Sequence, residues 1–238
     1  MKLRIFAFIF VLALLGAIPA LTAGQTMHTP PPGGALHQAL SWKGLYIGGN
    51  GSGLWAAPGQ FHFVEPDGSG DAPSTAQGAF IGGTAGYNFQ FAHKYVAGIE
   101  GDGDWTNISG VTYCPNDIYY CTSRVDALAS VRGRFGIAYK RWLFFGTGGL
   151  GIGDFKYRTY YVSTGVDYAK PYTATKEGWV AGGGAEFAAS HRIALKVEYG
   201  YYGFQSTTAP VGTLDGSYGY TIVNTIPQLI KLGLNYHF

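Results

Sequence analysis

Apolar and polar side chains alternate along the C-terminal segment 225–238. Leu232, Leu234 and Phe238 share one face of this segment, and Lys231 lies on the other. A repeat of two residues is typical of a β-strand that has one apolar and one polar face. An apolar face that ends on an aromatic residue suits lipid, whereas a face with a lysine suits a polar barrel interior. A strand of a soluble sandwich would show the same alternation, so the segment alone leaves both possibilities open.

The same alternation recurs along the chain. The stretches cover residues 45–57, 77–91, 95–106, 124–139, 142–161, 176–187, 192–204 and 225–238. Bacterial outer-membrane barrels have an even number of strands. We therefore predict an all-β fold, an eight-stranded antiparallel transmembrane β-barrel.

The connections between these stretches alternate in length. Short connections fall at 92–94, 140–141 and 188–191. Long ones, rich in Gly, Pro, Asp, Ser and Thr, fall at 58–76, 107–123, 162–175 and 205–224. Barrels of the outer membrane combine short periplasmic turns with long extracellular loops. The pattern predicts that both chain ends lie on the periplasmic side.

The two faces of the predicted strands differ in chemistry. The lipid-facing set is free of charge and includes Ile81, Ile99, Val125, Val131 and Leu150. The opposite face carries both signs of charge. The predicted lumen ion network consists of Glu100, Asp102, Asp104, Asp126, Arg132, Arg134, Glu186, Lys196, Glu198 and Lys231.

The interior of an eight-stranded barrel has room only for side chains. A buried charge without a partner costs several kcal/mol, roughly. We therefore expect Glu100, Asp102 and Asp104 to pair with Arg132 and Arg134 on the neighbouring strand. The lumen would then be a salt-bridged plug, which passes water only where the plug leaves gaps.

The start of the chain has the features of an export signal. Lys2 and Arg4 precede an apolar run at 5–18, and small residues follow. This run is shorter than the roughly 20 residues that a membrane-spanning helix needs, which argues against an anchor. The expected division is a signal peptide at 1–23, a proline-rich periplasmic linker at 24–41 and an outer-membrane barrel at 42–238.

The composition agrees with a membrane barrel. The chain has 38 Gly, 18 Tyr and 15 Phe, and charged residues make up 13%, against about 25% in soluble domains. Without Lys2 and Arg4 the basic and acidic residues balance. Nothing in this composition indicates a nucleic-acid partner.

Cys114 and Cys121 are the two cysteines of the chain and lie in a segment rich in Pro, Asn, Asp and Tyr. In an exported protein, such a pair is expected to form a disulfide. A ring this small stabilises by about 2.5 kcal/mol. The disulfide would order a loop and would not hold the fold together.

Two motifs partly match known cofactor or metal sites. Residues 146–151 match the dinucleotide pattern G-x-G-x-x-G, but a strand-like segment follows where a helix is needed. Asp102 and Asp104 hint at a calcium loop, but the later glycine and glutamate are missing. We expect no cofactor and no metal.

The sequence offers no convincing set of catalytic residues. Lipid hydrolysis in a small barrel would need a base beside a hydroxyl nucleophile, and no Ser and His pair is placed for it. We predict no enzymatic activity and no catalytic residues. His62 between Phe61 and Phe63 could contact haem or another apolar ligand, but a lone histidine of this kind is more often an ordinary loop residue.

Several segments together carry a family resemblance that covers nearly all of the chain beyond residue 40. Residues 41–50, 82–88, 131–136 and 231–238 resemble, in this order, the outer-membrane immunogenic protein family, small porin-like barrels related in architecture to the OmpA transmembrane domain. The resemblance implies a cell outer-membrane location, contact with outer-membrane lipid and lipopolysaccharide, and passage through periplasmic chaperones and the barrel-assembly machinery. The terminal segment is similar to the signal that this machinery reads. The predicted assembly signal consists of Lys231, Gly233, Tyr236 and Phe238.

We therefore expect a structural outer-membrane barrel and surface protein of a Gram-negative envelope, with a lumen filled by charged side chains. A narrow porin for small solutes is one alternative. Binding of a ligand such as haemin, or of a host surface, by the long loops is another. The solute, the ligand and the oligomeric state stay open.

Overall fold

The computed structural model describes residues 41–238 except 54–56, 66–67, 115–118, 168–170 and 213–217. For 53–75 and 207–225 only the backbone is described. The predicted signal peptide, and the predicted linker up to residue 40, lie outside the described residues. Within the described part of the chain, no helix is long and apolar enough to cross a membrane.

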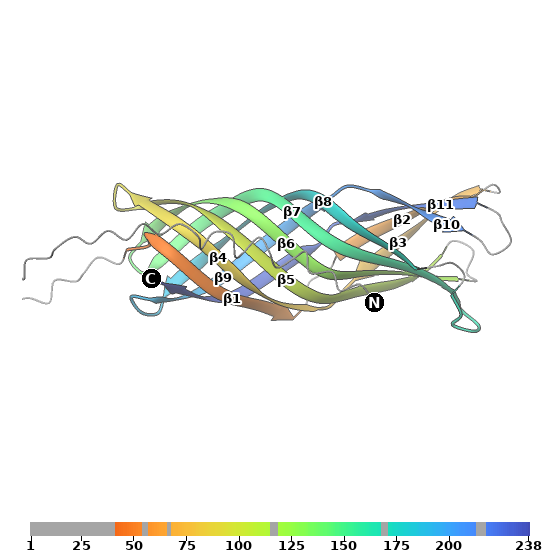
Figure 1. The fold of residues 1–238 in the computed structure, drawn as a ribbon, viewed down its shortest axis with the longest axis horizontal. Coiled ribbons are helices and arrows are strands. Elements are labelled where there is room, and N and C mark those ends of the chain that lie inside the picture. Colours follow the sequence, from red (N-terminus) through yellow and green to blue (C-terminus); the bar gives the residue numbers. More distant parts are fainter. Residues whose placement is uncertain (1–40, 54–56, 66–67, 115–118, 168–170, 213–217) are drawn as a thin grey trace, which may run out of the picture.

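The predicted eight-stranded barrel is confirmed. Neighbouring strands pair antiparallel, and the ring order is β1-β12-β9-β8-β7-β6-β5-β4, so the last strand in sequence closes the ring against the first (Figure 1). The barrel strands are β1 (Gly44–Gly53), β4 (Ala79–Phe91), β5 (Tyr95–Tyr113), β6 (Tyr119–Tyr139), β7 (Trp142–Tyr161), β8 (Tyr172–Ala188), β9 (Ile193–Phe204) and β12 (Gln228–His237).

Tight turns join β4 to β5, β6 to β7 and β8 to β9, where the sequence predicts short connections. Ala92, His93 and Lys140 adopt positive φ angles of 48°, 59° and 55° in the first two of these turns, a left-handed conformation that lets the chain reverse within a few residues. The C-terminus lies at the same end of the barrel (Figure 1).

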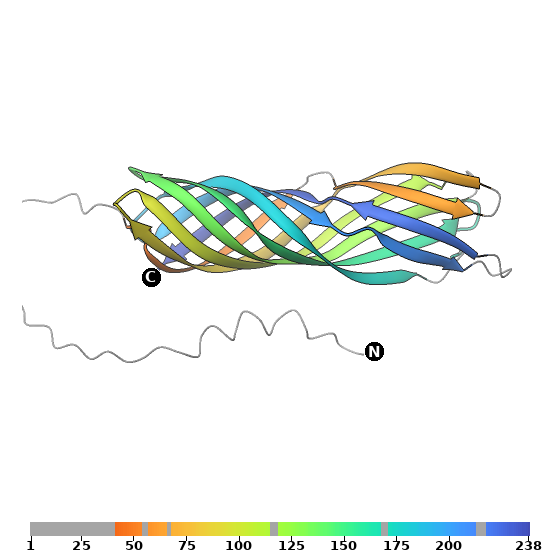
Figure 2. The same cartoon turned by 90° about the horizontal axis from the view of Figure 1, so that it is seen from above.

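Two of the predicted long connections are present, but they are not loops, because they contain strands. Residues 58–76 and 205–224 hold β2 (Ala57–Glu65), β3 (Gly68–Ala76), β10 (Thr207–Gly212) and β11 (Tyr218–Thr225). These form a four-stranded sheet in the order β10-β11-β2-β3, which lies beyond the barrel at the end opposite the turns (Figure 2). The pairing of β11 with β2 supplies hydrogen-bond partners from distant sequence, and this overrides a local composition typical of loops.

The other two long loops are shorter than predicted. β5 and β6 continue through most of 107–123, ending at Tyr113 and beginning at Tyr119. β8 begins at Tyr172, within the predicted loop 162–175. The extensions of β5 to β8 therefore face the second sheet at this end of the molecule (Figure 2).

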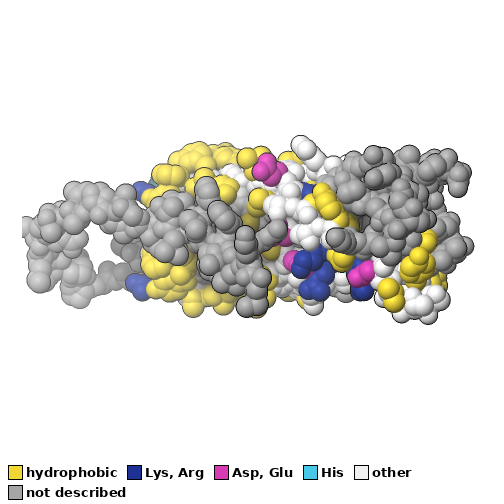
Figure 3. All heavy atoms as spheres, turned by 45° about the vertical axis from the view of Figure 1, so that its right-hand side comes forward, with side chains coloured by type: hydrophobic (Ala, Val, Ile, Leu, Met, Phe, Trp, Pro, Cys, Tyr) yellow, Lys and Arg dark blue, Asp and Glu magenta, His cyan; other side chains and the backbone are white. Residues whose placement is uncertain are grey.

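The outward face of the barrel is apolar, as the alternation predicts. Ile81, Leu150 and Phe238 expose 69%, 74% and 69% of their surface. Figure 3 shows hydrophobic side chains over the barrel half of the molecule, with charged side chains at its edges. Such a surface suits lipid.

The prediction is wrong at one point on β6, where Val125 and Asp126 exchange faces. Val125 is buried in the interior, and Asp126 lies outside, paired with Arg124 and Lys156. The ladder to β7 passes from Val125 directly to Ala127 and leaves Asp126 as an extra residue. A β-bulge of this kind shifts the alternation by one residue. Asp126 is therefore not part of the lumen network.

Candidate functional site

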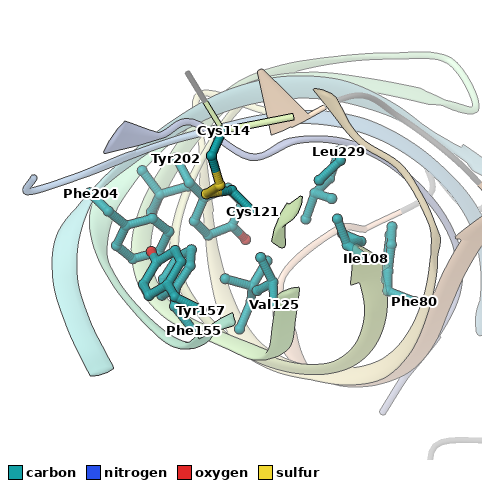
Figure 4. Close-up of a cluster of buried hydrophobic side chains, with 13 residues drawn as sticks. Phe80, Ile108, Cys114, Cys121, Val125, Phe155, Tyr157, Tyr202, Phe204 and Leu229 are labelled. Carbon is teal, nitrogen blue, oxygen red and sulfur yellow. A yellow bond between two sulfur atoms is a disulfide. The ribbon is translucent and has the colours of Figure 1, made fainter. Parts of the chain in front are cut away.

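The barrel interior has three zones. Near the turns, Trp42, Leu143 and Phe145 belong to one apolar cluster. Towards the second sheet a larger cluster includes Phe155 and Phe204, whose rings meet edge to face at 5.0 Å. Figure 4 shows the side chains of this second cluster pointing into the space that the strands enclose. Charged side chains fill the zone between the two clusters.

Arg132 on β6 lies at the centre of the charged zone. Its guanidinium donates to Glu100 at 2.6 Å, to Asp102 at 2.5 Å and to Glu198 on β9. These four side chains expose at most 1% of their surface. One guanidinium, with its planar array of donors, thus neutralises carboxylates from two strands that lie apart in the barrel wall.

Arg134 organises the part of the network nearer the turns. It donates to Glu186 on β8 at 2.8 Å and to the Tyr46 hydroxyl on β1 at 2.8 Å, and lies 3.5 Å from Glu100. The Tyr46 hydroxyl donates in turn to Glu100 at 2.6 Å. The guanidinium also stacks over the Phe145 ring at 4.2 Å. This arrangement joins the charged zone to the apolar cluster beside it.

Two lysines complete the network from the other side of the barrel. Lys231 on β12 contacts Asp104 at 2.5 Å and Asp102 at 3.1 Å. Lys196 on β9 contacts Glu198 at 3.1 Å and Glu100 at 3.4 Å. Asp104 therefore pairs with a lysine across the lumen and has no ion pair with an arginine of β6 among the described residues. In so narrow a lumen, opposite walls are within reach of a lysine side chain, so the partner of Asp104 is not on the adjacent strand.

The network links five strands through buried ions. Its members are Glu100, Asp102, Asp104, Arg132, Arg134, Glu186, Lys196, Glu198 and Lys231. Each of these side chains exposes at most 1% of its surface. Among them are five carboxylates and four cations, so nearly all the charge is compensated internally.

The sequence reasoning missed Tyr46. It occupies an inward position of β1, and the signal that could have identified it is its alternation with Leu45 and Ile47. Gly86 on β4 leaves the space that the tyrosine needs, because a Cβ there would lie 2.4 Å from the Tyr46 hydroxyl. The glycine thus allows the hydroxyl to reach Glu100.

The other candidate sites do not assemble in the described residues. Residues 146–151 lie within β7, without the helix that a dinucleotide site requires. Asp102 and Asp104 hold Lys231 between them, and the described part of the chain has no group of His, Cys, Asp or Glu suited to a metal. His62 lies in β2, where its backbone pairs with Asp71 and Ile222, and not in a loop.

The cysteines and the terminal residues lie at opposite ends of the molecule. Cys114 and Cys121 form a disulfide with Cα atoms 5.5 Å apart, buried at the far end of the β5–β6 hairpin. At the other end, Phe238 projects outward and meets the Tyr236 ring edge to face at 5.2 Å. Of the residues predicted as an assembly signal, Lys231 alone takes part in the lumen network.

Comparison with known proteins places this fold in a family. Residues 8–238 match the model of the outer membrane protein beta-barrel domain. The chain belongs to this family. It is similar to the 31 kDa outer-membrane immunogenic protein of Brucella melitensis biotype 1, with 32% identity over 95% of this chain and 97% of the relative. It is also similar to the 22 kDa outer membrane protein of Rhizobium leguminosarum bv. viciae, with 30% identity over 84% of this chain and 80% of the relative.

Among solved structures, the outer membrane protein OprG of Pseudomonas aeruginosa has a similar fold. The TM-score is 0.58 at 12% identity, covering 82% of this chain and 96% of that one. The protein is therefore an outer-membrane β-barrel of this family, and its location is the cell outer membrane. Because outer-membrane barrels combine short periplasmic turns with longer extracellular connections, we infer that the tight turns face the periplasm and that the second sheet lies outside the cell.

Proposed function

We propose that this protein is a closed structural barrel and surface protein of the outer membrane, with a lumen that does not conduct solutes. The observation that carries the proposal is the position of Arg132, fully buried and bonded to Glu100, Asp102 and Glu198 from two other strands. These contacts extend from β6 to β5 on one side and to β9 on the other, so the Arg132 side chain lies across the lumen.

The chemistry of the interior supports a stable plug. Removing one member of a buried ion pair leaves an uncompensated charge, at a cost of roughly 3–5 kcal/mol. A gate that opened through this zone would have to separate several such pairs at once. The apolar clusters on both sides of the network add a second barrier to ions, because they offer few polar groups to replace water.

The surface role rests on what lies outside the membrane. The second sheet and the extensions of β5 to β8 extend the protein well beyond its apolar band (Figures 1 and 2). The Brucella relative is named an immunogenic protein, which fits exposure at the cell surface.

Planar-bilayer recording of the purified, folded protein tests the closed lumen. We expect no reproducible conductance from the wild type, and discrete openings after combined Arg132→Ala and Arg134→Ala. Heat-modifiable migration on a gel selects the folded fraction of the variant. If too little folds, Arg132→Gln alone serves, since the amide keeps some hydrogen bonding. Reproducible single-channel currents from the wild type would refute the proposal in favour of a narrow porin.

A further inference from the structure

The described cations with exposed side chains fall into two groups, one at each end of the barrel. Beyond the apolar band on the extracellular side, Arg124 and Lys156 pair with Asp126, and Arg158 pairs with Asp167. The remaining exposed cations all lie at the periplasmic end. They are Lys43, Lys94, Lys140, Arg141 and Arg192, which we call the basic rim.

The basic rim surrounds the periplasmic opening. Lys43 precedes β1, Lys94 lies in the β4–β5 turn, Lys140 and Arg141 form the β6–β7 turn, and Arg192 ends the β8–β9 turn. Every periplasmic connection, and the place where the ring closes, therefore carries a cation. Figure 3 shows lysine and arginine side chains at this edge of the hydrophobic surface.

These cations are not compensated within the described protein. None forms an ion pair with a carboxylate side chain of the described residues, and the described turns contain no Asp or Glu. The two arginines make neutral hydrogen bonds only, Arg141 to the Ala189 carbonyl at 3.0 Å and Arg192 to the Tyr236 hydroxyl at 3.1 Å. Among the described side chains, the rim is thus a ring of positive charge.

The depth of the rim indicates its partner. The Lys94 ammonium lies 4.9 Å from the centre of the Tyr95 ring, and Lys140 lies 5.4 Å from that of Tyr139. Exposed aromatic side chains at strand ends mark the boundary between hydrocarbon and headgroups. Cations held over such rings lie at headgroup depth, closer to phosphodiesters than to a polymer farther into the periplasm.

We propose that the basic rim binds anionic glycerophospholipids of the periplasmic leaflet through their phosphate groups. Lysine and arginine beside an anionic membrane surface favour binding by about fivefold each. The rim would gather a shell of anionic lipid around the periplasmic end, while the lumen takes no part. This inference is independent of whether the lumen conducts.

Competition between two lipids tests the proposal. The full chain is folded in a neutral detergent, and native mass spectrometry measures how much phosphatidylglycerol and phosphatidylcholine of equal chain length it retains. We expect a preference for phosphatidylglycerol of about tenfold or more, weakened by salt because exposed charges are screened. Equal retention of the two lipids by the wild type overturns the proposal.

Two combined variants locate the site. Lys94→Gln, Lys140→Gln, Arg141→Gln and Arg192→Gln together should abolish most of the preference. Arg124→Gln, Lys156→Gln and Arg158→Gln together remove a similar amount of charge from the extracellular side and should preserve it. Loss of preference in the second variant overturns the assignment to the rim.

Folding and the alternative partner are controlled separately. If the variant with four substitutions lacks heat-modifiable migration, a second variant tests the lipid preference. It combines Lys43→Gln, Lys94→Gln and Lys140→Gln, whose ammonium groups make no hydrogen bond with another described residue. An unchanged preference in this lysine variant overturns the proposal. Cosedimentation with purified peptidoglycan that depends on the rim, without any lipid preference, would assign the rim to the cell wall instead.

Discussion

At the scale of single residues, the interior depends on a few side chains that each contact several others. Arg132 bonds carboxylates from two strands, and Arg134 joins Glu186 to the hydroxyl of Tyr46. Because these groups are buried, each one compensates a charge that has no access to water. Arginine and lysine side chains on the outside of the barrel are hydrated when they have no partner. Their ion pairs therefore contribute little to the free energy of unfolding.

Replacement of one buried and one exposed arginine of β6 measures this difference. Arg132→Ala should lower the free energy of unfolding by roughly 3–5 kcal/mol, because Glu100, Asp102 and Glu198 lose a shared partner. Arg124→Ala removes an exposed pair with Asp126 and should cost less than about 1 kcal/mol. Urea titration in lipid vesicles, followed by tryptophan fluorescence, gives both values. Equal losses would contradict the plug as a source of stability.

At the scale of elements, each of β5 to β8 runs through two environments, the charged zone and the apolar cluster beyond it. The half of each strand nearer the tight turns lines the charged zone. The half nearer the second sheet, here called the outer half, lines the apolar cluster that contains the disulfide. The bulge at Asp126 lies between these halves. By shifting the alternation it turns an acidic residue outward to Arg124 and Lys156 and turns Val125 inward. The bulge thus places an apolar side chain in the apolar cluster and a carboxylate beside two cations outside the barrel.

The disulfide should act on the outer half alone. Combined Cys114→Ser and Cys121→Ser should destabilise the tip of the β5–β6 hairpin by about 2.5 kcal/mol, since the bond closes a small ring. Hydrogen exchange should accelerate at 108–125 and stay unchanged at 131–137 in the membrane. The heat-modifiable migration of the barrel should persist. Its loss would mean that the extracellular hairpin supports the whole barrel.

At the scale of the whole molecule, the barrel depends on one closing strand. β12 pairs with β9 on one side and with β1 on the other. The backbone amide of Phe238 donates to the Leu45 carbonyl at 3.1 Å, at the seam between the two ends of the sheet. A sheet without this seam would have open edges, which a bilayer does not tolerate.

Deletion of Phe238 should therefore reduce the amount of assembled barrel in the outer membrane. The expected loss follows from the seam hydrogen bond and from the predicted assembly signal, of which Phe238 is the last residue. Phe89→Ala is the matched control, because Phe89 is also an outward aromatic with 58% exposure. Fractionation and heat-modifiable migration quantify both proteins. Normal levels of folded protein after the deletion would refute the importance of the terminus.

The sequence by itself determined what depends on near neighbours along the chain. The alternation predicts the barrel strands, their inward and outward faces and the three tight turns, because a strand's period of two is a local property of the backbone. The face of Lys231 follows from its place in the terminal strand. The family resemblance rests on segments that occur in the same order along the chain.

Only the tertiary structure decided which residues meet across the lumen. Asp104 pairs with Lys231, and Tyr46 joins Arg134 to Glu100, through contacts between strands far apart in sequence. The bulge that moves Asp126 outside, and the second sheet built from β2, β3, β10 and β11, also depend on distant partners. Local periodicity sets the side of the strand on which a residue lies. Its partner is set by the closed shape of the barrel, which brings opposite walls within reach of one side chain.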